Sequence, residues 1–263
     1  MPVVAANGIE IYYERRGAGP KLLFFNGSGA TIAHTGMLFD PYVKHFDVLA
    51  HDQRGLGQTS IPPGPYEMAD YAADAAALLD AVGWERCRVV GVSFGGMVAQ
   101  EFAVTWPERV ERLALVCTSP GGAYASYPLH QLEDLAPDDA ARLDATLLDT
   151  RFTSEWLATH DDDRALAELL FQRRANRSTG ETRRGELEQL SARSRLDVLD
   201  RLGAISCPTF LASGQYDGIA PPENGKAIAS RVPDSDLRLY DGGHVFMMQD
   251  PTAMPEIIGF LRG

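Results

Sequence analysis

The sequence is poor in lysine, and its basic residues are outnumbered by acidic ones. Lys21, Lys44 and Lys226 are the only lysines among 263 residues, and the formal net charge is −12. A chain with this charge repels a phosphate backbone, so nucleic acid is not expected as a partner.

Cysteines and long hydrophobic runs are also scarce. Cys87, Cys117 and Cys207 lie in or beside short apolar runs, which is typical of single buried thiols and not of a disulfide framework or a metal site. No apolar stretch is long enough to span a bilayer, and the N-terminus lacks a basic segment followed by an apolar core. We therefore expect a soluble cytoplasmic protein with no membrane partner and no metal.

The remaining composition is that of an ordinary globular protein, with 45% hydrophobic and 23% charged residues. A chain of this length forms one large domain, or one domain with an insertion. Asn7-Gly8 between two short runs predicts a hairpin turn. Residues 67–82 carry apolar or small side chains at helical spacing. Buried strands are predicted at Lys21–Phe25, Phe46–Ala50, Arg88–Val92, Leu113–Cys117, Thr209–Ala212 and Asp236–Tyr240. Apolar strands alternating with helices predict a mostly parallel, twisted α/β sheet covered on both faces.

This pattern changes between residues 121 and 202. The strand runs stop, and charged, helix-forming stretches take their place at 138–148, 154–159, 165–174 and 183–191. We call residues 121–202 the cap segment, because about eighty helical residues inserted into an α/β sheet suggest a cap, although a long helical excursion of the main domain is the alternative. The predicted core is then 1–120 and 203–263. Within the cap segment, Asp161-Asp162-Asp163 is expected to be a solvated helix start.

The stretch Gly91-Val92-Ser93-Phe94-Gly95-Gly96 carries the strongest functional signal. It follows an apolar strand and opens a helical run, which is the G-x-S-x-G pattern of a nucleophile elbow. In such a sharp turn, side chains at Gly91 and Gly95 would collide with neighbouring backbone. The pattern predicts that the hydroxyl of Ser93 stands above the sheet at a helix N-terminus.

A serine nucleophile needs a base, and the base needs a carboxylate to hold its tautomer. His244 is the only one of six histidines that follows the last predicted strand, and it lies in a glycine-rich loop. Asp217 follows the strand that begins at Thr209, and the carboxyl ends of parallel strands are where active-site groups gather. The alternatives are a surface-loop histidine and a helix-capping aspartate. Ser93, Asp217 and His244 are our predicted triad.

Acyl transfer also needs donors for the developing oxyanion. We expect the backbone N–H of Phe94, next to the nucleophile, and that of Ser28 in the loop Asn26-Gly27-Ser28-Gly29. The side-chain amide of Asn26 would brace this loop, with Gly27 giving it room; a simple tight turn is the alternative.

These motifs resemble the α/β-hydrolase superfamily over nearly the whole chain. Residues 1–120 and 203–263 are similar to the 3-oxoadipate enol-lactonase-like esterases. The resemblance rests on Asp217 and His244 and on the motifs Asn26-Gly27-Ser28-Gly29, Asp52-Gln53-Arg54-Gly55-Leu56-Gly57, Pro63-Gly64-Pro65-Tyr66 and Gly91-Val92-Ser93-Phe94-Gly95-Gly96-Met97. It implies the α/β-hydrolase fold with a helical cap insertion, and bracing of the active-site rim by Asp52 and Arg54.

The resulting expectation is a serine hydrolase that cleaves a small carboxylic ester or lactone through an acyl-enzyme, without a cofactor. The same triad also supports carbon–carbon bond hydrolysis or cofactor-free perhydrolysis. A non-catalytic ligand receptor on this scaffold is the alternative from another class. No sequence feature identifies the physiological substrate or the oligomeric state.

Overall fold

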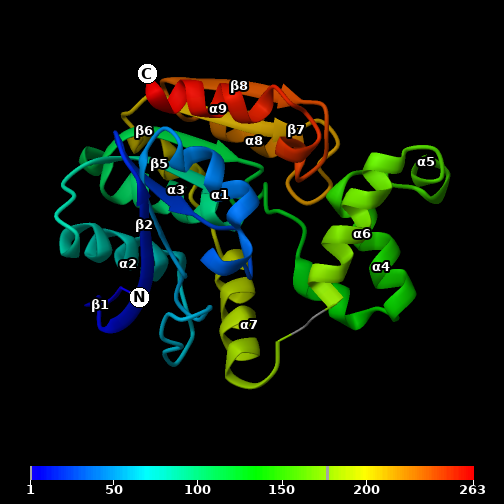
Figure 1. The fold of residues 1–263 in the computed structure, drawn as a ribbon, viewed down its shortest axis with the longest axis horizontal. Coiled ribbons are helices and arrows are strands. Elements are labelled where there is room, and N and C mark those ends of the chain that lie inside the picture. Colours follow the sequence, from blue (N-terminus) through cyan, green and yellow to red (C-terminus); the bar gives the residue numbers. More distant parts are fainter. Residues whose placement is uncertain (1, 176–177) are drawn as a thin grey trace.

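A computed structural model describes residues 2–175 and 178–263 of the chain. Its centre is an eight-stranded sheet with the strand order β1-β2-β4-β3-β5-β6-β7-β8 (Figure 1). The strands are β1 (Val3–Ala6), β2 (Ile9–Gly17), β3 (Lys21–Phe25), β4 (Asp47–His51), β5 (Cys87–Val92), β6 (Val110–Val116), β7 (Thr209–Gly214) and β8 (Ser235–Tyr240).

The sheet is mostly parallel, as predicted. Strands β4, β3, β5, β6, β7 and β8 pair in parallel, and β2 pairs antiparallel with both β1 and β4. The turn between β1 and β2 consists of Asn7 and Gly8, both with positive φ (48° and 76°), as a two-residue type I′ hairpin requires. The predicted hairpin and all six predicted strands are therefore confirmed, with ends that differ by a few residues, although most residues of β8 are exposed or half-buried.

The helices among the described residues are α1 (Gly36–Val43), α2 (Met68–Ala81), α3 (Phe94–Thr105), α4 (Pro137–Leu148), α5 (Ser154–Leu157), α6 (Asp161–Ala175), α7 (Gly180–Ser194), α8 (Pro222–Ala229) and α9 (Ala253–Arg262), with short 3₁₀ turns at Ile32–His34, Pro107–Arg109, Leu129–Asp134, Leu199–Ala204 and Phe246–Met248. Apart from α4, α5 and α6, these helices cover both faces of the sheet (Figure 1). Helix α1 was not predicted.

The buried side chains form one apolar cluster on each face of the sheet, because successive strand residues point to opposite sides. In β3, Leu23 and Phe25 join the cluster that includes α2, α3 and α8. Leu22 and Phe24 join the cluster that includes α1 and α9. Strands β3, β4, β5, β6 and β7 are thus largely buried on both sides, which accounts for their apolar sequences, whereas most residues of the edge strand β8 are exposed or half-buried.

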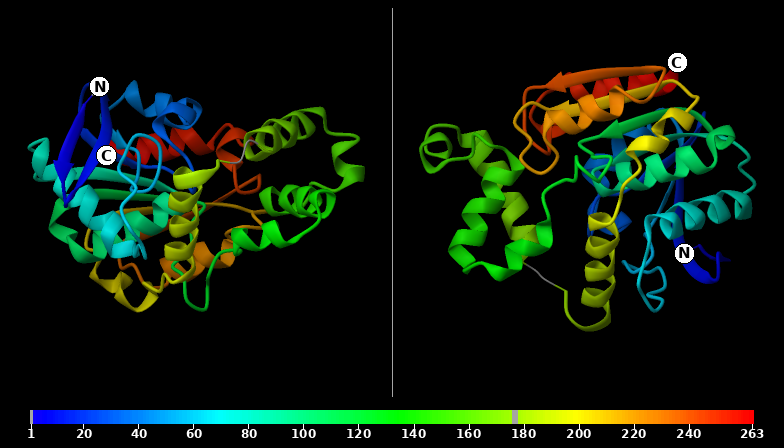
Figure 2. Two further views of the ribbon diagram at one scale, coloured as in Figure 1. Left: turned by 90° about the horizontal axis from the view of Figure 1, so that it is seen from below. Right: turned by 180° about the vertical axis from the view of Figure 1, so that it is seen from behind.

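The four helices α4 to α7 lie in the cap segment, between β6 and β7, and each overlaps one of the four predicted helical stretches. Figure 2 shows α4, α5 and α6 projecting to one side of the sheet, whereas α7 runs along the body of the molecule. Helix α6 begins at Asp161, which confirms the predicted helix start there. The division into core and cap as separate units stays a prediction.

Within residues 2–175 and 178–263, no helix combines the length and apolar character that a membrane crossing needs.

Candidate active site

Ser93 stands in a strained turn between β5 and α3. Its φ of 54° lies in the left-handed region that favours glycine, and ψ is −115°. The Ser93 N–H donates to the carbonyl oxygen of Val116 at 2.8 Å, and the hydroxyl of Thr118 donates to the Ser93 carbonyl at 2.8 Å. Hydrogen bonds to β6 and to Thr118, two residues beyond its end, therefore hold the backbone of Ser93 in this conformation.

The flanking glycines allow close backbone packing. A Cβ on Gly91 would lie 2.3 Å from the Gly95 carbonyl oxygen, and one on Gly95 would lie 2.2 Å from the carbonyl oxygen of Phe25. Real Cβ atoms do not approach backbone so closely, so both positions need glycine. The elbow packs directly on the end of β3, which brings Ser93 beside the loop that follows this strand.

His244 joins the serine to the acid. Its Nε2 lies 2.9 Å from Ser93 Oγ, and its Nδ1 lies 2.8 Å from Asp217 Oδ2. A carboxylate only accepts, so the Nδ1–H donates to Asp217 and Nε2 is left to accept the serine proton. The structure thus brings the three predicted residues together, although Ser93 and His244 are 151 positions apart in the chain.

Asp217 is almost completely buried, with 2% of its surface exposed. Its Oδ1 accepts the backbone N–H groups of Ile219 and Ala220, both at 2.8 Å, while Oδ2 faces His244. These bonds replace the water that burial removes and fix the direction of the carboxylate.

The loop that carries His244 rests on the end of α4. The His244 N–H donates to the Leu148 carbonyl oxygen at 2.6 Å, and a Cβ on Gly243 would lie 2.0 Å from that oxygen. The neighbouring Asp149, which is fully buried, accepts hydrogen bonds from Arg151 and from Gln249. The cap segment therefore contributes directly to the placement of His244, through a contact that the sequence analysis missed.

The loop 26–29 lies next to the nucleophile. A Cβ on Gly27 would be 3.7 Å from Ser93 Cβ, and the backbone N–H groups of Ser28 and Phe94 have no acceptor among the described residues. The side-chain amide of Asn26 is buried and likewise has no partner there. Instead, the side chain of Gln53 donates to the Asn26 carbonyl oxygen at 2.8 Å. The predicted roles of Ser28, Phe94 and Asn26 stay predictions.

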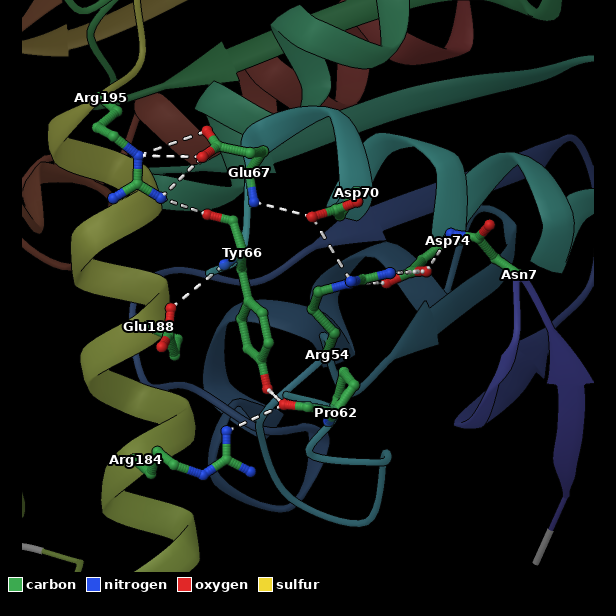
Figure 3. Close-up of polar contacts among 10 residues, drawn as sticks. All are labelled: Asn7, Arg54, Pro62, Tyr66, Glu67, Asp70, Asp74, Arg184, Glu188 and Arg195. Carbon is green, nitrogen blue, oxygen red and sulfur yellow. Dashed lines mark hydrogen bonds and ion pairs between the residues drawn. The ribbon is translucent and has the colours of Figure 1, made fainter. Parts of the chain in front are cut away.

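The motif 52–57 supports this region at two points. Asp52 accepts the backbone N–H groups of Ile32 and Gln58 at 2.8 and 3.0 Å, while burial raises the pKa of Asp52 and these bonds oppose the shift. Arg54 forms a buried, two-bond pair with Asp74 on α2 (Figure 3). Asp52 thus braces the segment after the loop 26–29, and Arg54 anchors the motif to the core.

Burial keeps the side chains of Cys117 and His51 neutral near neutral pH. Burial raises the pKa of the Cys117 thiol well above its usual range, and the Asp217 carboxylate adds to the shift. Burial lowers the pKa of His51 to about 4. A thiolate at Cys117 is therefore disfavoured near neutral pH. In the part of the chain that the structure describes, no group of three or more metal-ligating side chains occurs.

Large apolar side chains of the cap segment, which could form the walls of a substrate pocket, have different surroundings. Leu169 is 37% exposed and Trp156 is half-buried. Leu170 packs against a small apolar cluster formed by Leu132, Leu147, Leu148 and Ile219. The side chains of Phe171, Arg173 and Arg174, and residue Arg177, lie outside the described residues.

The family follows from comparison with known proteins. The family model described as alpha/beta hydrolase fold matches residues 21–251. The chain therefore belongs to the α/β-hydrolase fold family and is a hydrolase, which confirms the predicted fold class and the prediction of an enzyme.

Three curated relatives cover most of the chain. It is 29% identical to a poly(3-hydroxyalkanoate) depolymerase of Ectopseudomonas oleovorans, over 92% of this chain and 84% of that protein. It is 28% identical to a putative carbamate hydrolase, RutD, of Azorhizobium caulinodans, over 99% and 98%. It is 26% identical to 3-oxoadipate enol-lactonase 2 of Acinetobacter baylyi, over 89% and 85%.

Among solved structures, the enol-lactonase from Burkholderia xenovorans LB400 superimposes with a TM-score of 0.80 at 22% identity and covers both chains completely. The resemblance to enol-lactonase-like hydrolases is thereby confirmed in fold and in sequence.

Proposed function

We propose that this chain hydrolyses a small carboxylic ester or lactone through a Ser93–His244–Asp217 triad and an acyl-enzyme intermediate. The observation that carries the proposal is the unbroken chain of two hydrogen bonds from Asp217 through His244 to Ser93, at 2.8 and 2.9 Å. This arrangement gives the serine hydroxyl a base within proton-transfer distance.

In the first half of the reaction, Ser93 Oγ bonds to the substrate carbonyl carbon while its proton moves to His244 Nε2. Asp217 stabilises the resulting imidazolium, and the N–H groups of Phe94 and Ser28 donate to the oxyanion. Collapse of the tetrahedral intermediate breaks the bond to the leaving oxygen, which takes the proton from His244.

In the second half, water takes the position of the leaving group. His244 accepts a proton from this water, whose oxygen bonds to the acyl carbon, and the proton then returns to Ser93 Oγ as the carboxylic acid leaves. No cofactor takes part in either half.

The cap segment, residues 121–202, would then cover the site and select the substrate, with residues 1–120 and 203–263 as the catalytic core. Two contacts support this assignment: Leu148 supports the His244 loop, and Gln189 on α7 contacts the loop 26–29. Changes in the cap segment should therefore alter the ranking of substrates while Ser93 still reacts with a small fluorophosphonate.

The names of the relatives differ in the bond that is cleaved: a polyester, a carbamate and an enol-lactone. All three present a carbonyl carbon bearing a heteroatom leaving group, and this shared chemistry supports the ester or lactone class here. The net charge of −12 agrees with a small-molecule substrate and not with nucleic acid. A cytoplasmic location stays a prediction.

The test is Ser93→Ala, assayed with p-nitrophenyl esters, lactones, aryl carbamates and vinylogous diketones, and labelled with a fluorophosphonate. We expect wild type to be labelled and to turn over an ester or lactone, and Ser93→Ala to lose labelling and several orders of magnitude in kcat. The control is Ser119→Ala, because the Ser119 hydroxyl is buried without a partner among the described residues and its loss should be harmless.

Wild-type turnover by Ser93→Ala would refute the serine mechanism. An unlabelled, inactive wild type would favour the ligand receptor. Turnover of only the diketones would favour carbon–carbon cleavage, and peracid formation in the presence of peroxide would identify a perhydrolase.

A further inference from the structure

Gln189 on helix α7 reaches from the cap segment to the loop beside the nucleophile. Its side chain is buried, with 1% of its surface exposed, and its Oε1 accepts the backbone N–H of Gly29 at 2.7 Å. The two residues are 160 positions apart in the chain. Because a backbone N–H only donates, the amide orientation is fixed: Oε1 faces Gly29 and Nε2 points elsewhere.

Few other bonds hold this loop. The Ala30 N–H donates to the Gly27 carbonyl oxygen within the turn, and Gln53 donates to the Asn26 carbonyl oxygen. Gly29 has a φ of +66°, and two glycines flank Ser28, so the backbone on either side of Ser28 has wide conformational freedom. On the C-terminal side of Ser28, the contact with Gln189 ties the loop to the cap segment, in addition to the bond within the turn.

Side chains of helix α7 and of Arg195, directly after it, bind chiefly to backbone atoms of the core (Figure 3). Arg184 donates to the carbonyl oxygen of Pro62, Glu188 accepts the N–H of Tyr66, and Arg195 donates to the carbonyl oxygen of Tyr66. A Cβ on Gly185 would lie 1.9 Å from the carbonyl oxygen of Gly55, so the two backbones touch. Gln189 therefore projects from a support whose position is set by the core.

The residue type itself argues against a role in packing alone. The Gln189 Nε2 is buried without a partner among the described residues, and leaving such a donor unpaired lowers stability. A methionine would fill the same space without this cost. Buried polar groups are ordinarily hydrogen-bonded, and exceptions such as the Gln189 Nε2 are expected at functional sites.

We infer that Gln189 is a positioning residue, supplied by the cap segment, that fixes the loop 26–29 so that the Ser28 N–H points at the oxyanion. The inference rests on the proposed function, since it assigns Ser28 the role of an oxyanion donor. Oxyanion donors act only when they are held at hydrogen-bond distance from the charge that develops, so a loosened loop loses transition-state stabilisation and leaves substrate binding intact.

The experiment compares four variants with wild type in p-nitrophenyl ester turnover. Gln189→Met removes the acceptor at nearly constant length, Gln189→Asn keeps an amide that no longer reaches Gly29, and Gln189→Glu keeps an acceptor at the same reach. Glu188→Ala is the matched control, because it removes a docking bond of the same helix one residue away.

We expect Gln189→Met and Gln189→Asn to lower kcat about tenfold or more with KM within threefold of wild type, and to weaken a trifluoromethyl ketone inhibitor by the same factor as kcat/KM. Gln189→Glu should recover most of kcat, and Glu188→Ala should stay within threefold. If Gln189→Met does not fold, Gln189→Asn carries the same test.

The inference would be overturned if both Gln189→Met and Gln189→Asn kept wild-type kcat, or if Glu188→Ala lost as much kcat as they do. It would also be overturned if Gln189→Glu were as impaired as Gln189→Met. Failure of the serine mechanism is seen separately, as an unlabelled wild type or an active Ser93→Ala.

Discussion

Helix α7 and the helices α4 to α6 come from one inserted segment but join the core in different ways. Helix α7 buries Gly185, Gln189, Ala192 and Arg193. In α5 no residue is buried, and among the residues of α6 whose side chains are described none is. The end of α4 places Leu147 and Leu148 in a small apolar cluster with Ile219, and α6 touches this region at its edge through Leu170 and through Asp163, which accepts from Gln249 at 3.4 Å. The two attachments that contact the loops of the proposed site are therefore the end of α4 and one face of α7.

The largest effect should come from Asp217. The loop that carries it contacts the end of α4, where the Gly218 N–H donates to the Leu147 carbonyl oxygen. Asp217→Asn preserves size but stabilises the wrong tautomer of His244, and by analogy with serine proteases kcat should fall about 10⁴-fold. Single-turnover ester kinetics measure this loss. Asp241→Asn, an exposed carboxylate in the neighbouring loop, serves as the control and should retain activity. A loss below about tenfold in Asp217→Asn would mean that the catalytic acid lies elsewhere.

Asp149, at the end of α4, should show the next largest effect. Its side chain is 1% exposed and pairs with the 18% exposed Arg151 at 2.7 Å. Asp149→Ala leaves the guanidinium and Gln249 without this partner, and breaking such a buried pair costs about 3 kcal/mol in the free energy of unfolding. Urea denaturation measures the change.

The matched control for Asp149 is Asp161→Ala on α6, whose pair with Arg164 is exposed to solvent. Exposed pairs contribute little, so its urea midpoint should not move. Equal midpoints for the two variants would remove the distinction between the end of α4 and the rest of the insertion.

Contact between the backbones of α7 and the core predicts a third effect. Gly185→Ala places a methyl group against Gly55 and should lower the free energy of unfolding by about 1–3 kcal/mol, because the helix must move away. Gly259→Ala in α9 is the control, since no atom lies within 4 Å of the added carbon. It should raise stability by up to about 1 kcal/mol through helix propensity. Thermal unfolding of both variants separates crowding from propensity, and a stable Gly185→Ala would contradict the close contact.

The smallest effect should come from the outer surface of α6, and a substitution on the buried face of α7 provides the comparison. Leu169→Ser on α6 changes a partly exposed position and should alter the free energy of unfolding by less than about 0.5 kcal/mol. Ala192→Ser on α7 adds a hydroxyl at a fully buried position and should cost about 1–3 kcal/mol. Calorimetry of the pair checks this order, and the reverse order would contradict the assignment of α7 to the core.

The sequence predicted the parts of this molecule that depend on local pattern. Strand β3 was predicted with its observed ends because a lysine and four apolar residues, Lys21–Phe25, are followed directly by Asn26-Gly27. The elbow was predicted because its backbone leaves no space for side chains at Gly91 and Gly95. The three residues of the predicted triad were found from chain order and strand ends.

Features that depend on contacts between distant segments were not predicted. Gln189 carries no signal, since a glutamine in a charged helix is ordinarily exposed and its partner is a backbone atom 160 positions away. In the sequence, nothing distinguishes Asp149 from the other acidic residues of the insertion. Its role depends on hydrogen bonds from Arg151 and Gln249 that only the fold reveals. Helix α1 was missed because it is short and contains Pro41.

The paired glycines of α7 and the core also define where this chain tolerates replacement by foreign sequence. A graft that exchanged all of residues 121–202 would need a new glycine opposite Gly55, a new acceptor for Gly29 and a new carbonyl beneath His244. A graft confined to α5 and α6 would keep all three. Exchanging α5 and α6 alone could then alter the substrate range while these three contacts to the core are kept.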